Sequence, residues 1–177
     1  MIALEIVLDV ILLAVCAAGA YTDIRKHIIP DWLTYPTIAL GVLVRFAFHG
    51  SGSVFGYGLV SAVFGAGTCF LLFGLFVVWG KGMGGGDVKL MTAVGALAGF
   101  RHSLTCMMCA GIVGAILAVL LVIAKRRVTA TAKGIWLQFY SRSADGTRAK
   151  VTLPYGLAIF LGAIWATLMK YGLMHGA

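Results

Sequence analysis

Six apolar runs, separated by polar turns, constrain the fold of this chain more than any other feature of its sequence. The runs cover residues 2–22, 32–48, 54–79, 88–100, 103–124 and 152–173. A helix needs roughly 20 mostly apolar residues to cross a bilayer, and most of the runs are close to that length. We therefore predict an all-α fold, a polytopic membrane protein with about six transmembrane helices embedded in a lipid bilayer.

The overall composition agrees with this fold class. Hydrophobic residues make up 61% of the chain and charged residues only 11%, with a mean hydropathy of +1.00, which is too apolar for a soluble domain. Six spans and their turns use up the 177 residues, so we predict a single transmembrane domain over residues 1–177. The N-terminus lacks the positive segment of a cleavable signal peptide and carries Glu5 and Asp9 instead, so the first run is predicted to be a retained helix.

The fourth run, residues 88–100, is short for a full span. A helix of about 13 residues reaches only about 20 Å, whereas the hydrocarbon core is about 30 Å thick. We expect this helix to tilt little, to thin the bilayer or to break.

Basic residues are concentrated in the first, third and fifth predicted loops and at their edges. They are Arg25, Lys26, Lys81, Lys89, Lys125, Arg126, Arg127, Lys133, Arg142, Arg148 and Lys150. By the positive-inside rule these loops face the cytoplasm and both termini lie outside. On the outer side Arg101 is an exception, while Arg45 and Lys170 are expected to snorkel outward from helix ends. Topology thus explains most of the net charge of +8, and we predict no nucleic-acid partner.

Two polar segments allow simple explanations. The long loop 125–150 alternates basic and aromatic residues, and either lies on anionic lipid or forms a solvated connector. Glu5 and Asp9 share one face near the outer end of the first helix, where we expect water or headgroups to satisfy their carboxylates.

The four cysteines fall within apolar runs, at Cys16, Cys69, Cys106 and Cys109. We predict that they are buried as small hydrophobic residues and form no disulfide framework. The last two make a lone C-x-x-C without the second pair that a tetrahedral zinc site needs, so no metal and no cofactor is predicted.

Asp23 and Asp87 carry the strongest chemical signal. Asp23 falls at the cytoplasmic end of the first helix, and Asp87 at the same depth before the fourth. An aspartate beside hydrocarbon is costly to keep ionised, so each is a candidate functional residue. Two close carboxylates tend to share one proton, so that one acts as a base toward water and the other as an acid toward a carbonyl. The pair predicts a membrane aspartyl protease, without indicating which aspartate holds the proton.

Neighbouring residues extend this candidate site. Gly84, Gly85 and Gly86 precede Asp87 and are predicted to let a substrate backbone come close, because they lack a Cβ. Arg25 and Lys89 are candidate substrate-binding residues that would steer acidic groups, or they serve only the positive-inside rule.

A third aspartate on the same side, Asp31, follows Pro30 and is predicted to be the N-cap of the second helix.

Three stretches together resemble one known family. They are Thr22-Asp23-Ile24-Arg25 with Ile29-Pro30-Asp31-Trp32-Leu33-Thr34, then Gly84-Gly85-Gly86-Asp87-Val88-Lys89-Leu90, then Leu153-Pro154-Tyr155-Gly156-Leu157-Ala158-Ile159. The chain resembles the type IV prepilin peptidases, membrane aspartyl proteases of the G-x-G-D class, although Asp31 stands where that family typically has asparagine.

The resemblance implies that Asp23 and Asp87 are the catalytic aspartates. The substrate would be a prepilin, cut at the cytoplasmic face of the bacterial cytoplasmic (inner) membrane. Larger members carry an insert with two C-x-x-C pairs, associated with N-methylation, that this chain lacks. It therefore looks like the small, peptidase-only branch of tight-adherence (Flp) pilus systems. The resemblance also suggests that Pro154 and Gly156 shape a wall of the site, although a proline is equally expected at a helix start. The sequence indicates no oligomeric state.

Two other functions stay open. A presenilin-like intramembrane protease also uses G-x-G-D, but places its aspartates deeper in longer helices. A small transporter or channel subunit would use the aspartates as a proton or cation relay, although the repeated halves common in such folds are not evident.

Overall fold

The computed structural model describes residues 2–26, 28–52, 54, 56, 58–79, 84–124 and 155–175, and the regular structure in these ranges is helical. The helices are α1 (Ile2–Lys26), α2 (Asp31–His49), α3 (Leu59–Trp79), α4 (Gly85–Ala124) and α6 (Tyr155–His175). The predicted all-α class is confirmed. The predicted loop 125–150, with residues 151–154 and Lys81, lies outside the described residues.

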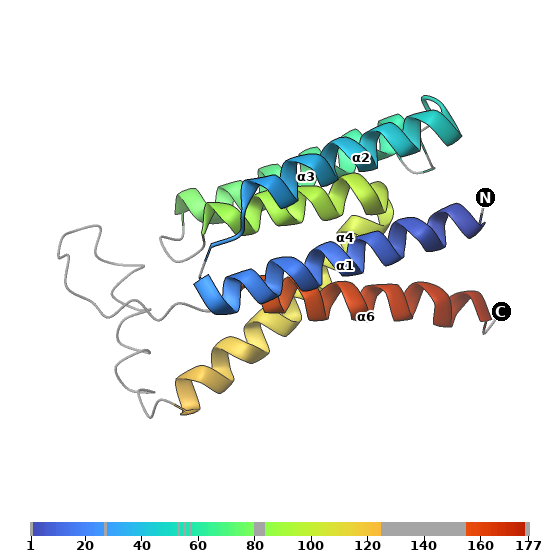
Figure 1. The fold of residues 1–177 in the computed structure, drawn as a ribbon. Helices are drawn as coiled ribbons and strands as arrows, with labels where there is room; N and C mark the ends of the chain where they lie inside the picture. Colours follow the sequence, from blue (N-terminus) through green and yellow to red (C-terminus); the bar gives the residue numbers. More distant parts are fainter. Residues whose placement is uncertain are drawn as a thin grey trace.

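The helices form a bundle with two distinct ends (Figure 1). At one end α1 finishes while α2, α4 and α6 begin, and we call this the Asp23 end. At the other end α1 begins and α6 finishes, and we call this the Glu5 end. Successive helices thus alternate in direction, as the predicted topology requires.

Helix α4 consists of two arms that meet at a sharp turn. Gly99 has φ 73° and ψ 173°, a conformation that side chains rarely tolerate. Ser61 of α3 fits against this turn, because its hydroxyl accepts a 3.1 Å hydrogen bond from the N–H of Phe100. Figure 1 shows the chain reversing here, so the first arm, residues 85–98, and the second arm, residues 100–124, correspond to the predicted fourth and fifth helices.

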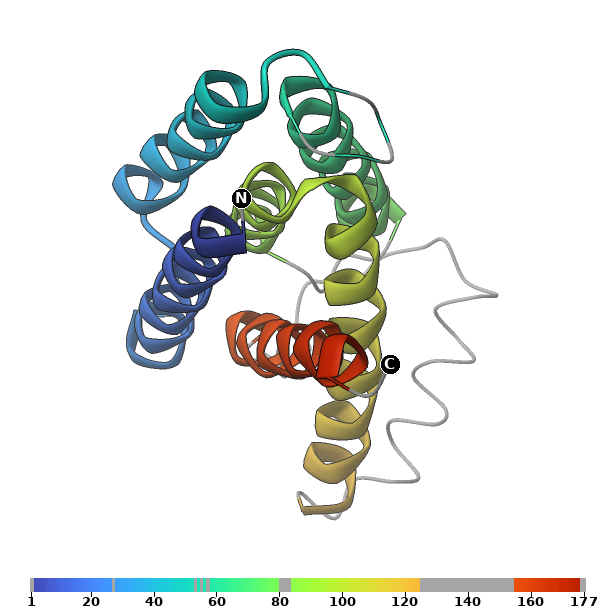
Figure 2. The same ribbon diagram turned by 90° about the vertical axis from the view of Figure 1, so that its right-hand side faces the viewer.

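The first arm occupies the centre of the bundle (Figure 2). Its fully buried residues include Leu90, Met91, Ala93, Val94, Ala96 and Leu97. A helix enclosed by protein does not need to match the thickness of a bilayer, because its ends can meet polar groups of other helices. Residues 85–98 form one continuous helix that ends at Gly99, so the expected break within this short helix is not observed, and its tilt and its effect on bilayer thickness stay predictions.

Small residues let the helices touch backbone to backbone. Gly65 of α3 packs directly against Gly95 of the first arm, and Gly162 of α6 packs against Ala110 of the second arm. A Cβ on any of these glycines would collide with the opposite backbone. Close approach through small residues is a common way for membrane helices to gain packing contacts.

Three of the described helical segments are long and apolar enough to cross a membrane. They are Leu4–Lys26, Leu59–Val78 and Gly85–Leu120, the last including the turn at Gly99. The predicted number of about six spans is therefore not confirmed. Helix α3 exposes Phe64, Phe70, Leu71, Phe76 and Val78, an outward apolar face suited to lipid.

The third predicted helix, placed at 54–79, was wrong at its start. Helix α3 begins at Leu59, five residues after the predicted start. Gly58 has φ 113°, and the N–H of Leu59 donates to the carbonyl of Gly50 over 3.0 Å. The positive φ of Gly58 therefore explains why the helix begins after the start of the apolar run.

Candidate active site

Asp23 lies in the last turn of α1 and is buried, with 8% of its surface exposed. Its Oδ2 accepts a 2.8 Å hydrogen bond from the backbone N–H of Gly156, the second residue of α6. The first N–H groups of a helix have no partner within it and carry a partial positive charge, so they suit a carboxylate. Helix α6 thus fixes the orientation of Asp23.

Asp87 lies in the first turn of α4 and is also buried, with 6% exposed. Its Oδ2 accepts a 3.2 Å hydrogen bond from the N–H of Gly84, just before the helix, while its own N–H donates to the carbonyl of Gly84 over 3.1 Å. This is half of a capping box, in which a side chain of the first turn satisfies the N–H at the cap. The helix start therefore holds the carboxylate in place.

The fold brings these two aspartates together at the Asp23 end. They are close enough for the negative charge of Asp23 to act on Asp87. The charge of Asp87 in turn reaches Tyr155, the first residue of α6 and the neighbour of Gly156. Two buried carboxyl groups from distant parts of the sequence thus lie near one another beside the start of α6, where the negative charge of one disfavours ionisation of the other.

The three glycines before and within the start of α4 differ in their surroundings. Gly86 packs against Ile29, to whose Cβ an added Cβ would lie 3.0 Å away. Gly84 and Gly85 are exposed, and a Cβ on Gly85 would meet nothing within 4 Å. Packing within the described chain therefore explains the glycine at 86 but not the one at 85.

The basic candidates Arg25 and Lys89 contact other groups at this end. Lys89 forms a 2.7 Å ion pair with Asp31, and its ammonium lies 5.2 Å from the ring centre of Tyr35. The guanidinium of Arg25 lies 5.2 Å from the ring centre of Tyr21. Both basic groups lie on the side of the bundle where the sequence placed them.

The predicted N-cap role of Asp31 was wrong. Pro30 occupies the cap position and no side chain caps this helix start, so Asp31 is its first residue. A carboxylate already inside the first turn is favourable near the helix N-terminus and remains free to reach across to Lys89 on α4.

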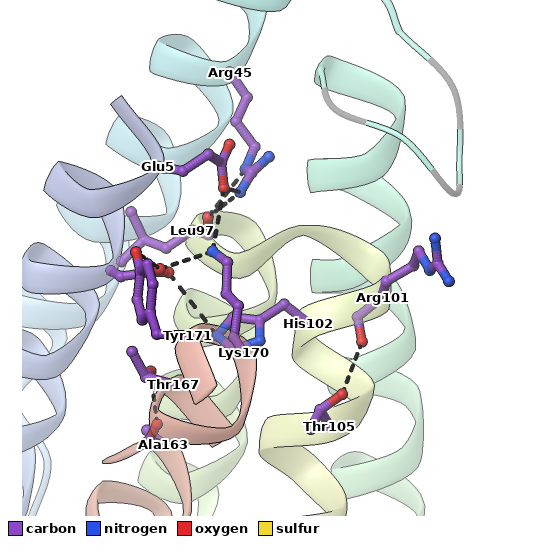
Figure 3. Close-up of polar contacts among 11 residues, drawn as sticks. Glu5, Arg45, Leu97, Arg101, His102, Thr105, Ala163, Thr167, Lys170 and Tyr171 are labelled. Carbon is purple, nitrogen blue, oxygen red and sulfur yellow. Dashed lines mark hydrogen bonds and ion pairs between the residues drawn. The ribbon is translucent and has the colours of Figure 1, made fainter. Parts of the chain in front are cut away.

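A second polar cluster lies at the Glu5 end, and the sequence predictions for its members were wrong (Figure 3). Arg45 does not snorkel outward: it is 1% exposed, donates to the carbonyl of Leu97 over 2.7 and 3.0 Å, and lies 3.4 Å from Glu5. Lys170 likewise pairs with Asp9 at 2.7 Å. The acids and bases of α1, α2 and α6 form ion pairs with one another, because these faces of the helices turn inward instead of toward headgroups.

The thiol predictions are confirmed for all four cysteines, which are free and buried. Within the described ranges, no group of three or more histidine, cysteine or acidic residues could hold a metal ion.

Residues 10–119, more than half of the chain, match the type IV leader peptidase family. Among curated proteins, the chain is 39% identical over 106 residues to prepilin peptidase EppA of Methanothermobacter thermautotrophicus, covering 57% of this chain and 26% of that protein. Over 117 residues it is 34% identical to a prepilin leader peptidase/N-methyltransferase of Xanthomonas campestris, covering 62% and 38%. Over 124 residues it is 32% identical to the protein of the same name in Escherichia coli, covering 65% and 52%.

The chain therefore spans between about a quarter and about half of the length of these relatives. No solved structure gives a significant match. The family match includes both aspartates and the turn at Gly99 that separates the two arms of α4. On this match, the chain belongs to the type IV leader peptidase family.

Proposed function

We propose that this protein is a membrane aspartyl endopeptidase that removes the leader peptide from type IV-like prepilins. Asp23 and Asp87 are its catalytic residues. The observation that carries the proposal is their arrangement: both are buried, each is fixed by a backbone N–H, and the charge of one acts on the other. Family membership and the names of the relatives, which include prepilin peptidase and prepilin leader peptidase, support the same reaction.

In the proposed mechanism the two carboxyl groups share one proton. The ionised carboxylate takes a proton from a water molecule, which attacks the scissile carbonyl carbon, while the protonated carboxyl donates to the carbonyl oxygen. Collapse of the tetrahedral intermediate returns a proton to the leaving amine, and no covalent bond to the enzyme forms. The hydrogen bonds from Gly156 and Gly84 both end on Oδ2 atoms, so they orient each carboxyl group through one oxygen.

The leader junction would lie extended over Gly84, Gly85 and Gly86. The exposed position of Gly84 and Gly85, beside buried Asp87, supports this placement, because a backbone without side chains leaves room for an incoming peptide. We assign Arg25 and Lys89 to membrane topology and not to substrate binding, since each already contacts an aromatic ring and Lys89 also pairs with Asp31.

The Asp23 end would face the cytoplasm. Its described basic residues, Arg25, Lys26 and Lys89, are exposed or half-buried there. At the Glu5 end, by contrast, Arg45 is buried and Lys170 half-buried, which leaves Arg101 as the exposed basic residue described there. Two of the three exposed basic side chains in the described ranges, Arg25 and Lys26, thus lie at the Asp23 end, which favours that end as the inner one.

The depth of the aspartates separates this proposal from a presenilin-like protease. Asp23 is in the last turn of α1 and Asp87 in the first turn of α4, so cleavage would occur at the membrane boundary. We further propose that the substrates are Flp-type prepilins, which rests on the motif pattern of the chain.

Co-expression with a candidate prepilin tests the proposal. Loss of the leader is followed by gel shift and N-terminal sequencing for the wild type, Asp23→Asn and Asp87→Asn at matched membrane levels. Asp31→Asn is the matched control, because it removes a carboxylate from the same end of the bundle but from an exposed position.

We expect Asp23→Asn and Asp87→Asn each to abolish cleavage and Asp31→Asn to retain it. Normal cleavage by both buried-site variants would exclude the protease and leave ion transport as the function to test. Failure of a Flp prepilin alone, when another type IV prepilin is cut, would exclude only the substrate assignment.

A further inference from the structure

A cavity of about 390 Å³ lies at the Glu5 end, away from the candidate active site. Glu5 of α1, Arg45 of α2 and Lys170 of α6 line it, together with Arg101 and Thr105 of the second arm of α4. Arg101 and Met169 are exposed as well as lining the cavity, so it reaches the protein surface.

The charges on the described lining are unbalanced toward positive. Arg45, Arg101 and Lys170 are cations, and Glu5 is the acid among the described lining residues. Counting Asp9, which holds Lys170 at 2.7 Å, still leaves an excess of one positive charge. Figure 3 shows the guanidinium of Arg101 standing apart from Glu5 and Lys170, and within the described ranges no acidic residue pairs with it. Such a lining attracts an anion.

Two buried polar atoms at the cavity have no hydrogen-bond partner among the described residues. One is Oε1 of Glu5, a residue that is only 9% exposed. The other is Nε2 of His102, which also lines the cavity and lies 3.9 Å from the nearest Asp9 oxygen, beyond hydrogen-bonding distance. Buried polar atoms are normally satisfied, so these two indicate a bound group that offers a hydroxyl to Glu5 and an oxygen to His102.

The surface beside the cavity is apolar along α6. Leu161, Trp165 and Met169 are spaced four residues apart, lie on one face, and are between 38% and 46% exposed. Met169 lines the cavity, so this stripe runs from its mouth toward the middle of the bundle. A free phosphate would have no use for such a stripe, whereas an acyl chain would lie along it.

We propose that this cavity binds the phosphate group of an anionic phospholipid whose headgroup carries a hydroxyl. Arg101 and His102 hold the phosphate oxygens, the headgroup hydroxyl donates to Oε1 of Glu5, and an acyl chain follows the stripe on α6. The cavity lies at the end of the helices, because Glu5 is near the start of α1 and Arg45 and Lys170 are near the ends of α2 and α6, and this position matches the depth of lipid headgroups.

Thermal unfolding of the full-length protein in detergent tests this site. The shift in Tm is titrated with short-chain phosphatidylglycerol, with phosphatidylcholine of the same chain length, and with inorganic phosphate. Arg101→Gln removes the cation at the cavity, and Lys26→Gln removes an equal charge from the Asp23 end as a control. Thr105→Phe fills the cavity without changing its charge.

We expect phosphatidylglycerol to raise Tm in the wild type and in Lys26→Gln. Its apparent affinity should fall about tenfold in Arg101→Gln, as expected for one lost charge-assisted hydrogen bond, and also in Thr105→Phe. Equal shifts from phosphatidylcholine, or equal weakening in Lys26→Gln, would overturn the site. A matching effect of inorganic phosphate alone would overturn the lipid and assign the cavity to free phosphate.

Discussion

The backbone N–H of Gly156 donates a 2.8 Å hydrogen bond to Oδ2 of Asp23, and Gly156 has no room for a side chain. A Cβ at this position would lie 2.9 Å from the Cβ of Asp23 and 3.0 Å from Oδ2. The start of α6 therefore fixes the position of one of the two proposed catalytic carboxylates.

Gly156→Ala should push Asp23 away from its position and lower kcat/KM for prepilin cleavage by about 10²-fold, the cost of a misplacement near 1 Å. Gly172→Ala is the matched control in the same helix, because a Cβ there would meet nothing within 4 Å. Cleavage kinetics in proteoliposomes measure both variants. Equal rates for Gly156→Ala and the wild type would show that the contact between Gly156 and Asp23 has no role in cleavage.

Neutralising Arg25 and Lys89 together, as Arg25→Gln with Lys89→Gln, should leave the rate of leader cleavage within about twofold of the wild type in purified, reconstituted protein. The physical reason is that both cations already contact neighbours outside the aspartate pair. Reconstitution matters, since in cells the same changes alter the positive-inside signal. A large rise in KM with unchanged kcat would instead assign these residues to substrate binding.

Arg45→Met should destabilise the protein by about 3 kcal/mol or more, because it removes the guanidinium from the buried Glu5 carboxylate and from the Leu97 carbonyl. Lys170, 3.6 Å from Glu5, is then the remaining cation beside that carboxylate. The free energy of unfolding is measured by titration with SDS in mixed micelles. Adding Glu5→Gln to Arg45→Met should recover part of the lost free energy of unfolding, since the buried carboxylate that lost its guanidinium partner is then replaced by a neutral amide. Strictly additive losses would contradict direct coupling of the two residues.

Gly99→Ala should destabilise the bundle by about 2 kcal/mol, because alanine is strained at φ 73° and its Cβ would lie 2.8 Å from Oγ of Ser61. Gly67→Ala, within α3, should do the opposite and stabilise by about 0.5 kcal/mol, since a Cβ there is unobstructed and alanine favours a helix. The same SDS titration separates the two signs. Stabilisation by Gly99→Ala would argue against the turn.

How far the sequence predicts this structure depends on what each signal measures. Apolar runs report length and depth, so the ends of α1, α2 and the arms of α4 could be placed, and Asp23 and Asp87 assigned to one end. They do not report which way a helix face turns. Residues Glu5 and Arg45 were therefore expected at the membrane surface, although they meet inside the bundle.

Other features depended on contacts that no local pattern contains. The turn at Gly99 is surrounded by Ser61 and Arg45, which come from distant parts of the sequence. The pairing of Asp31 with Lys89 needed the start of α2 to lie beside α4. The hydrogen bond from Gly156 of α6 to Asp23 likewise depends on the tertiary fold, although Gly156 lies within one of the three motif stretches.

The first arm of α4 has Asp87 near its start and Leu97 near its end, where the Leu97 carbonyl accepts hydrogen bonds from Arg45. Ten helical residues make a stiff rod of about 15 Å between them. The hydrogen bonds from Arg45 to Leu97 at the Glu5 end therefore help to fix the position and rotation of Asp87 at the opposite end of the bundle. In saturation mutagenesis scored for leader cleavage, sensitive positions should therefore form two separate groups. One group should surround the aspartates, and the other should surround the hydrogen bonds between Arg45 and Leu97.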